Sequence, residues 1–437
     1  MHVLLLAFGS RGDVQPILAL AGGLQSAGYA VSIGAGINFK DWIEGAGFRY
    51  APFSTDMHAL MQSEAGRRWI EQSSRNPIAG LKFMRQMMDD VSDDTNAELL
   101  AACEDADVIV SGLPVFPMAA AIAEKYGKPH IRTMFVPMKP TRYPELSIFP
   151  YSPKRPSFLN VVAGYVGINF LWSVPKQATN ELRERLGLKK WGYWGYARAW
   201  NQTPTLYGLS THTVPPADDW PGENAVTGYW FWDDHGEWQP SPELLAFLES
   251  GPPPVYVGFG SMSSSDPAGT LKIVVDALEK SGQRGIVYRG WADMSADDLP
   301  ENIFSLDGAP HDWLFPQMAG VVHHGGAGTT AAALRAGVPT TIVAHMADQP
   351  YWGRRTVELG VAPTFIPRHK LSVDTLAEAI TAMVTDDGIK QRAADLGKKI
   401  QAENGVENAV KALGEMIGGP GQASASVSTD SLWRGIN

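Results

Sequence analysis

The strongest constraint on the fold is a recurring order of elements: a short apolar run, a glycine-containing turn, and then a segment with apolar residues at helical spacing. The first copy has an apolar run that ends at Phe8, a turn at residues 9–12, and helical spacing from Val14 to Leu24. Strands that alternate with helices in this way form a parallel sheet covered by helices. Further strands are predicted at residues 29–33, 107–111, 130–136, 254–261, 285–288, 320–323 and 340–345.

The chain is long enough for two such units. Its 437 residues exceed the usual size of one hydrophobic core, and an irregular stretch separates the predicted strands into two groups. We expect an α/β protein with one doubly wound domain over residues 1–215 and a second over residues 225–415, joined near Val214. Residues 418–437 are rich in glycine, serine and alanine, and predict a flexible tail.

The composition excludes several classes of protein. Hydrophobic residues make up 44% and charged residues 19% of the chain, as in folded globular proteins. The net charge of -10 argues against a nucleic-acid binder. The single cysteine, Cys103, allows no internal disulfide and gives no basis for a zinc site, so we expect a reducing, cytoplasmic location. No apolar run approaches the roughly 20 residues that span a bilayer.

The glycine-rich turn after His323 is the most informative segment. A strand ends there and a helix follows, so that backbone N–H groups and the helix dipole can meet a phosphate. The turn carries neither the lysine of a P-loop nor the dinucleotide-binding glycine spacing. We predict a diphosphate site here, with tight helix packing as the alternative explanation of the glycines. Its residues are Gly325, Gly326, Ala327, Gly328 and Thr329.

A second polar pair follows the next strand. Asp348 and Gln349 place a carboxylate beside an amide, which suits vicinal sugar hydroxyls. They lie one helix and one strand after His323, so both loops should open at the same carboxyl edge of the sheet, where ligands bind. The alternative for Asp348 is that it caps the helix that begins near Pro350.

Residues 323–349 resemble the nucleotide-sugar signature of the UDP-glycosyltransferases with the GT-B fold, which has two Rossmann-like domains facing across a cleft. Residues 9–16 and 309–316 resemble the sterol 3-β-glucosyltransferases and their bacterial antibiotic-modifying relatives. The likeness covers residues 1–415. It implies an enzyme that moves a hexose, in the first place glucose, from a UDP-sugar to a hydroxyl of a sterol, triterpenoid or polyketide-like acceptor, with inversion.

The same resemblance implies roles for individual residues. His323 would contact the diphosphate, Ser261 would reach the phosphates, and Asp348 and Gln349 would hold sugar hydroxyls. Trp291 and the loop that contains His311 would surround uracil. The alternatives are an exposed loop aromatic for Trp291 and a helix cap for His311. The neighbouring His324 is expected to pack under the turn.

An inverting transfer also needs a base on the other domain. Asp13 follows the first strand, and the resembled subgroup has an aspartate at this place where many relatives have a histidine. We therefore predict that Asp13 is the catalytic base. The alternative is that it caps the helix from Val14, and Arg11 could pair with it and oppose the role. The charge of the departing diphosphate would be met by His323 and the helix, so no metal and no cofactor besides the UDP-sugar are expected. Asp105 and Asp107 are interpreted as a chance match to a metal motif.

Acceptor residues are less clearly marked. Residues 75–91 and 133–149 should lie over the cleft edge of the first domain, and ordinary core packing is the competing explanation. With Lys82 and Arg85, the first of these segments would also suit contact with a membrane. Aromatic residues at 191–196 and 228–232 would line an acceptor pocket or pack between the domains. The predicted acceptor contacts are Arg11, Met84, Met88, Phe135 and Met138.

Three other functions remain as alternatives to a UDP-sugar transferase. A TDP-sugar-dependent antibiotic glycosyltransferase would share the same motifs. A non-catalytic sugar-nucleotide-binding protein would keep His323 and Asp348 but would need no base at position 13. A nicotinamide oxidoreductase is disfavoured because the first turn lacks three spaced glycines and the second strand ends in Gly34-Ala35-Gly36-Ile37-Asn38 with no ribose-binding acid.

Overall fold

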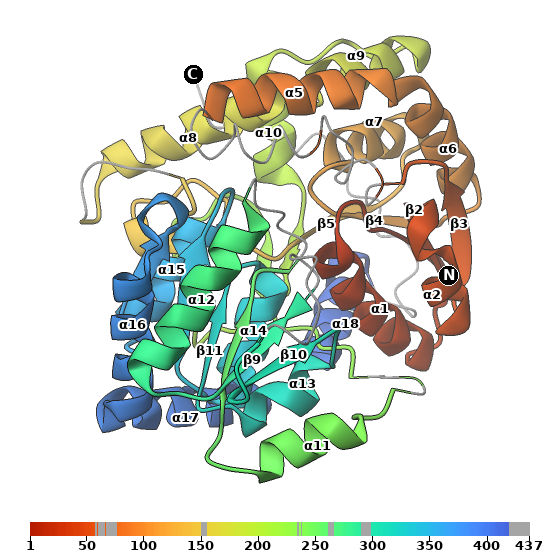
Figure 1. Cartoon of the computed structure of the whole chain (residues 1–437). Helices are drawn as coiled ribbons and strands as arrows, with labels where there is room; N and C mark the ends of the chain where they lie inside the picture. The colour runs from red at the N-terminus through yellow and green to blue at the C-terminus, as the bar shows by residue number, and fades with distance from the viewer. Residues whose placement is uncertain are drawn as a thin grey trace.

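The structure is a computed structural model with two parallel sheets, each covered by helices (Figure 1). It describes residues 1–56, 59, 66, 77–149, 155–233, 236, 238–260, 266–289 and 299–418. The first sheet has the order β3-β2-β1-β4-β5-β6-β7. Its strands are β1 (His2–Leu6), β2 (Ala30–Gly36), β3 (Arg49–Phe53), β4 (Val108–Ser111), β5 (His130–Met134), β6 (Thr205–Tyr207) and β7 (Asn224–Val226).

Alternation along β1 divides the core of the first domain into two layers. Val3 and Leu5 face the layer that contains α1 (Arg11–Ser26), whereas Leu4 and Leu6 face the layer that contains α7 (Phe116–Tyr126). Both faces of the strand are apolar because helices cover both sides of a parallel sheet. Among the described residues up to 202, the other helices are α2 (Lys40–Gly45), α5 (Pro77–Asp90), α6 (Ser92–Glu104), α8 (Phe158–Trp172), α9 (Lys176–Arg185) and α10 (Tyr193–Gln202).

The second sheet has the order β10-β9-β8-β11-β12-β13. The strands after β8 are added on one side of it and those from β11 onward on the other side, and β8 and β11 are parallel neighbours. Doubly wound sheets bind ligands at the carboxyl ends of the strands at such a point. The strands of this second sheet are β8 (Val255–Gly258), β9 (Gly285–Tyr288), β10 (Ile303–Leu306), β11 (Gly320–His323), β12 (Thr340–Ala344) and β13 (Phe365–Pro367). The remaining helices are α11 (Pro242–Glu249), α12 (Pro267–Ser281), α13 (His311–Leu314), α14 (Ala327–Ala336), α15 (Gln349–Glu358), α16 (Val373–Thr385), α17 (Asp387–Gln401) and α18 (Gly405–Met416).

The boundary between the domains lies later in the chain than residues 215–225. Strand β7 pairs with β6 and so belongs to the first sheet. Helix α18 also returns to the first domain, where Ala409 and Leu413 are buried in one cluster with Val14 and Leu24 of α1. A Cβ at Gly23 would lie only 2.4 Å from Val406, so the glycine allows this close approach of the two helices. The predicted tail beyond residue 418 lies outside the described residues.

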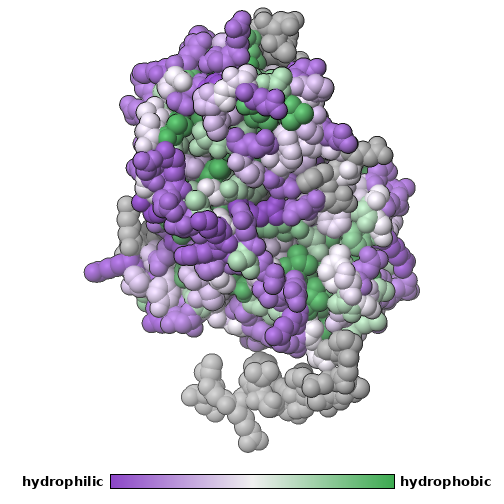
Figure 2. Space-filling view, turned by 90° about the horizontal axis from the view of Figure 1, so that it is seen from below, coloured by the Kyte–Doolittle hydropathy of each residue, from purple (hydrophilic) through white to green (hydrophobic). Residues whose placement is uncertain are grey.

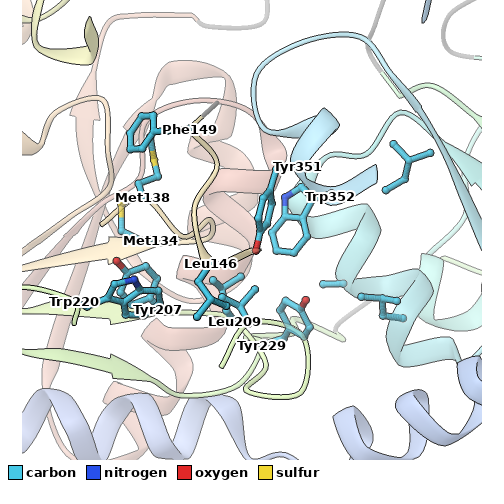
Figure 3. Packing of buried hydrophobic residues seen from close by; sticks show 14 of the residues in the cluster. Met134, Met138, Leu146, Phe149, Tyr207, Leu209, Trp220, Tyr229, Tyr351 and Trp352 are labelled. Atoms are coloured by element: carbon cyan, nitrogen blue, oxygen red, sulfur yellow. The ribbon is translucent and has the colours of Figure 1, made fainter. Parts of the chain in front are cut away.

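The two domains are held together by polar and aromatic contacts. Arg335 of α14 forms an ion pair of 2.7 Å with Asp233 and stacks on the ring of Phe231 at 3.8 Å. Tyr351 of α15 donates to the backbone oxygen of Glu145 at 3.1 Å, beside Leu146 in Figure 3. For residues 228–232, packing between the domains is therefore the correct one of the two interpretations. The segment at 191–196 is divided, because Tyr196 is buried in the core and Trp194 is exposed.

Candidate active site

The two predicted donor loops lie next to each other. His323 is the last residue of β11, Asp348 follows β12, and these strands are paired in parallel. Both loops therefore open at the carboxyl edge of the second sheet, as the sequence predicts. Helices α14 and α15 start directly after these loops (Figure 1).

His323 is fully buried and carries a defined proton. Its Nδ1 lies 3.1 Å from the backbone nitrogen of Gly325, and since that N–H can only donate, Nδ1 must accept. Burial holds the pKa of His323 well below its usual value, so the ring is neutral and its proton is on Nε2. Nε2 is buried and has no partner among the described residues. A buried N–H donor of this kind is strongly favoured to meet an acceptor oxygen.

The start of α14 has the geometry that a phosphate site needs. No side chain caps this helix, whose N-cap residue is Gly326. The N–H groups of the first turn belong to Ala327, Gly328 and Thr329, and they add to the positive end of the helix dipole. Gly325 has a φ of 92°, and a Cβ on it would lie 2.6 Å from Ile342. The glycines thus serve close packing as well as the turn. Phosphate binding itself stays a prediction.

Asp348 does not cap α15, which corrects the alternative interpretation. Its Oδ2 accepts a hydrogen bond from Trp352 Nε1 at 2.9 Å, and the helix has no side-chain cap. Burial, with a smaller contribution from the nearby charge of Asp13, raises the pKa of Asp348 to about 6, although the Trp352 hydrogen bond opposes the shift. The residue before Asp348, Ala347, has a φ of 54°, which is unusual for a non-glycine residue. The backbone of this loop is therefore strained.

The predicted role of Gln349 needs a correction. Its side chain is buried, and Oε1 accepts the backbone N–H groups of His345 and Met346 at 2.7 and 3.0 Å. The carbonyl oxygen is therefore occupied inside the loop. Only the amide N–H of Gln349 remains to contact a sugar hydroxyl.

Asp13 lies in a capping box at the start of α1. Its Oδ2 accepts from the backbone N–H of Ser10 at 2.7 Å and from Ser10 Oγ at 3.1 Å. Gly9 has a φ of 136°, and a Cβ there would lie 2.2 Å from the same oxygen, so the carboxylate packs directly on the glycine. Burial raises the pKa of Asp13 although the Ser10 bonds oppose the shift. Since its charge also raises the pKa of Asp348, the two carboxylates interact across the domains. Capping uses one oxygen and leaves the base hypothesis open.

Arg11 does not pair with Asp13, so the alternative that would oppose the base role is not seen. Its guanidinium lies over the ring of Trp42 at 4.7 Å. Burial lowers the pKa of His311 to about 4, and the Arg11 charge contributes, which places Arg11 near the second domain. The ring of His311 stacks on Phe315 at 4.3 Å, and no side-chain bond caps α13, so the capping alternative for His311 is wrong.

Of the remaining residues near the predicted donor site, two lie outside the described residues and one has a packing role. Ser261 and Trp291 lie outside the described residues. His324 is half-buried, and Cβ atoms placed on Gly260 and Gly326 would meet its ring at 3.1 and 2.6 Å. The expectation that His324 packs under the turn is therefore confirmed.

All five acceptor predictions fall in the first domain, and apart from Arg11, described above, the structure corrects two of them. Met138 is only 2% exposed and lies in the core beside Phe149 (Figure 3). Met88 packs against the core cluster behind β1. Phe135 is partly buried, with its ring edge-on to Trp230 at 5.5 Å, while Met84 is half-buried on α5. The pattern of apolar residues could not separate an inward from an outward face.

Two residues at the same sheet edge were not predicted. His345 follows β12, where its Nδ1–H donates to the backbone oxygen of Val343 at 3.0 Å and its ring packs near Phe259 at 5.7 Å. Arg368 follows β13, and its charge adds to the burial that lowers the pKa of His345 to about 4. Both residues come directly after a strand, whereas His323 is the last residue of its strand. The end of the predicted strand at 340–345 could have identified His345, but β13 was not predicted, so no such signal marked Arg368.

The aspartates at 105 and 107 lie away from this edge. Asp107 precedes β4 and accepts from the backbone N–H of His2 at 2.7 Å. Asp105 lies 4.0 Å from Arg49. Both are at the amino end of the sheet, so their interpretation as a chance match is confirmed. Within the described ranges, no group of three or more His, Cys, Asp or Glu residues could hold a metal ion.

Family models match both halves of the chain. The glycosyltransferase family 28 N-terminal domain matches residues 3–144, and the erythromycin biosynthesis protein CIII-like C-terminal domain matches residues 287–416. Among curated proteins, sterol 3-beta-glucosyltransferase UGT80B1 of Arabidopsis thaliana is 35% identical over 429 residues, which cover 94% of this chain and 68% of that protein. A sterol 3-beta-glucosyltransferase of Komagataella phaffii is 34% identical, again over 94% of this chain but only 34% of its own length.

Solved structures share the fold at lower identity. The calicheamicin glycosyltransferase CalG4 has a TM-score of 0.66 at 17% identity, with 96% of this chain and 99% of that chain covered. The glycosyltransferase VinC, solved in complex with DTDP, has a TM-score of 0.61 at 18% identity and covers 96% of this chain and 100% of its own. With two doubly wound domains and these relatives, the chain belongs to the GT-B glycosyltransferases, in the family of the sterol 3-beta-glucosyltransferases.

Proposed function

We propose that this glycosyltransferase moves glucose from UDP-glucose to a hydroxyl of a sterol or similar lipophilic acceptor, with inversion and without a metal ion. The observation that carries the donor half is the buried Nε2–H of His323, which has no partner in the described structure and lies beside an uncapped helix start. The sterol relatives at about 35% identity support the acceptor class and the sugar.

Departure of UDP requires stabilisation of the negative charge that develops on the β-phosphate. Neutral donors can supply it: His323 Nε2–H, and the N–H groups of Ala327, Gly328 and Thr329 at the positive end of α14. All of them are held by backbone structure before substrate binds, so little reorganisation is needed. This arrangement supports a mechanism that does not depend on a cation.

Attack by the acceptor is assigned to the first domain. As the acceptor oxygen bonds to the anomeric carbon, its proton passes to the Asp13 carboxylate, and the bond from that carbon to the phosphate oxygen breaks with its electron pair leaving on UDP. Asp13 comes from the domain opposite the donor loops, which suits attack from the face opposite the leaving group. Its raised pKa makes it a stronger base than an exposed aspartate.

The test is a product assay with UDP-glucose, TDP-glucose and UDP-galactose, each with and without a sterol. We expect a sterol monoglucoside from UDP-glucose, detected by mass spectrometry, with the β-anomeric configuration in its NMR spectrum. Preference for TDP-glucose would favour the antibiotic-type alternative. Tight UDP binding without any product from a broad acceptor panel would favour the non-catalytic alternative, and an α-anomer would exclude inversion.

The donor sugar should bind in a pH-dependent manner through Asp348. With a pKa of about 6, this carboxylate is charged above that pH and protonated below it, and a charged acceptor holds a hydroxyl more tightly than a neutral one. We expect the Kd of UDP-glucose, whose phosphates do not titrate in this range, to rise about tenfold between roughly pH 7.5 and pH 5, whereas the Kd of UDP also follows the protonation of its terminal phosphate at about pH 6. Isothermal titration calorimetry measures both.

Two variants make this measurement decisive. Asp348→Asn should bind UDP-glucose weakly at every pH, and Asp13→Asn should move the midpoint to lower pH because the Asp13 charge adds to the raised pKa of Asp348. A rise of the UDP-glucose Kd at low pH that persists in Asp348→Asn would contradict the role of Asp348.

A further inference from the structure

Helix α8 is apolar on a side that faces solvent. Its 15 residues, Phe158–Trp172, contain no charged side chain. At 100° per residue, its exposed large side chains lie within one third of the helix circumference. Phe158 and Val166 are 71% and 64% exposed. A helix on a protein surface usually turns a polar side to water, so this side needs a partner. The exposed side chains are Phe158, Leu159, Val162, Val166 and Phe170.

The opposite side of α8 is fixed to the first domain. Ile168 and Trp172 are buried in the core, and a Cβ on Gly164 would lie 2.9 Å from Pro140. Tyr193 of α10 donates to the backbone oxygen of Tyr165 at 3.0 Å. The exposure of the apolar side is therefore a property of a well-packed helix and does not result from loose docking.

Trp194, in the first turn of α10, is a further exposed aromatic side chain. It is 77% exposed, and its ring lies 4.9 Å from that of Tyr193, the residue that is hydrogen-bonded to α8. Tryptophan is the side chain most typical of the boundary between lipid headgroups and acyl chains. We call the five exposed α8 side chains and Trp194 the α8 face.

Basic residues flank the α8 face. Arg155 precedes the helix and Lys176 follows it, and both are exposed. Lys82 is exposed on α5, which lies along the same upper edge of the molecule in Figure 1, and Arg85 of this helix is exposed and pairs with Asp89 at 3.7 Å. In a chain with a net charge of -10, this local arrangement suits an anionic surface. A twofold contact between copies would bring Arg155 of one α8 near Lys176 of the other, which disfavours self-association.

The opposite side of the molecule has a different character. Figure 2, seen from below, shows a surface on which hydrophilic residues predominate and hydrophobic residues form small groups. Helices α11 and α17 lie at that lower edge in Figure 1. The α8 face thus lies at the edge of the molecule opposite this hydrophilic side.

The length of α8 decides how it can meet a bilayer. At about 22 Å it is shorter than the roughly 30 Å hydrocarbon core. No single helix in the described ranges is long and apolar enough to cross a membrane. Helices α8 and α9 taken together have the required length and composition, but they are bent by 67° at the break between them. In α9, however, Arg183 is buried and pairs with Glu124 of α7 at 2.7 Å. Since α9 is held in the domain, α8 can only lie along the membrane surface.

We propose that the α8 face docks on a lipid bilayer, with the helix in the plane of the membrane and its apolar side chains at the level of the upper acyl chains. The inference rests on the proposed function, because a sterol-like acceptor resides in the bilayer. Docking through α8 would hold the first domain, which faces the donor loops with Asp13, against the source of that acceptor. In this proposal α8 provides the apolar contact with the membrane, whereas contact through residues 75–91 stays a prediction.

The experiment is flotation of the purified chain with phosphatidylcholine vesicles, with and without about 30% phosphatidylserine. The test variants are Phe158→Glu and Val166→Glu, both at exposed positions where folding should persist. The matched controls are Leu245→Glu on α11, 39% exposed, and Tyr126→Glu, 55% exposed. We expect each α8 variant to bind vesicles at least about tenfold more weakly than wild type, with the controls unchanged and binding to anionic vesicles weakened by salt.

Three outcomes would overturn the proposal: no vesicle binding by wild type, unchanged binding by both α8 variants, or equal loss in the controls. A wild-type dimer that Val166→Glu converts to a monomer, without vesicle binding, would assign the face to a second copy. Transfer to sterol delivered by cyclodextrin separates the two proposals. If the α8 variants lose flotation but keep this transfer, both proposals stand. If wild type floats but transfers nothing, the proposed function fails alone.

Discussion

Replacement of Asp13 by asparagine is expected to lower kcat by about 10²- to 10⁴-fold, the usual contribution of a positioned general base. The variant keeps the shape of the side chain but removes the charge that would accept the acceptor's proton. The affinity for UDP should be unchanged, because the donor loops belong to the second domain. Steady-state kinetics with a sterol acceptor and calorimetry with UDP measure the two quantities.

The capping role of Asp13 requires a control in the same experiment. Asparagine still offers an oxygen to the N–H of Ser10, so the helix cap and the Tm should persist. Asp41→Asn, at an exposed position in the first turn of α2, gives a matched change without expected effect on kcat. An unchanged rate in Asp13→Asn would remove the residue from the mechanism and leave only its cap.

His323→Ala is expected to lower kcat/KM by about 10²- to 10³-fold, as loss of a preorganised donor to a developing anion does. It should also weaken UDP binding but leave the affinity for uridine unchanged, since uridine has no phosphate. His323→Gln restores an N–H donor and should recover part of the loss. Calorimetry with UDP and with uridine distinguishes a contact of His323 with the phosphates from a contact with the uracil ring.

The control for His323 is His212→Ala, a matched change at an exposed histidine. It should leave both affinities and kcat/KM unchanged. If His323→Ala weakens uridine and UDP equally, or if only its Tm falls, His323 supports the fold of the loop and has no direct phosphate contact.

The predictable part of the fold is the part that local sequence determines. The predicted bounds of β9 and β11 match the structure, and the runs at 107–111 and 130–136 contain β4 and β5. The strands that were missed are short or at the sheet edge. Strands β6, β7 and β13 have three residues each, too few to show an apolar period.

The position of the candidate site was predictable where a strand ends in a turn. The hydrogen-bond partners of its side chains were less predictable. The glycines after His323 identify a close turn in the sequence itself. No residue type in the sequence marks the strained backbone at Ala347. The hydrogen bond from Trp352 to Asp348 and the occupied oxygen of Gln349 belong to the same loop, and they could not be predicted either. Burial of Met138 depends on residues far away in the chain, so no local pattern could reveal it.

The return of α18 to the first domain has a consequence for biosynthesis. Ala409 and Leu413 help to fill the core behind α1, so the first domain lacks part of its interior until these residues leave the ribosome. The second domain, whose strands and helices are all made before α18, can complete its own core earlier. Domains usually fold in the order of synthesis. Here the half that is translated first can complete its core only after the second half has been synthesised.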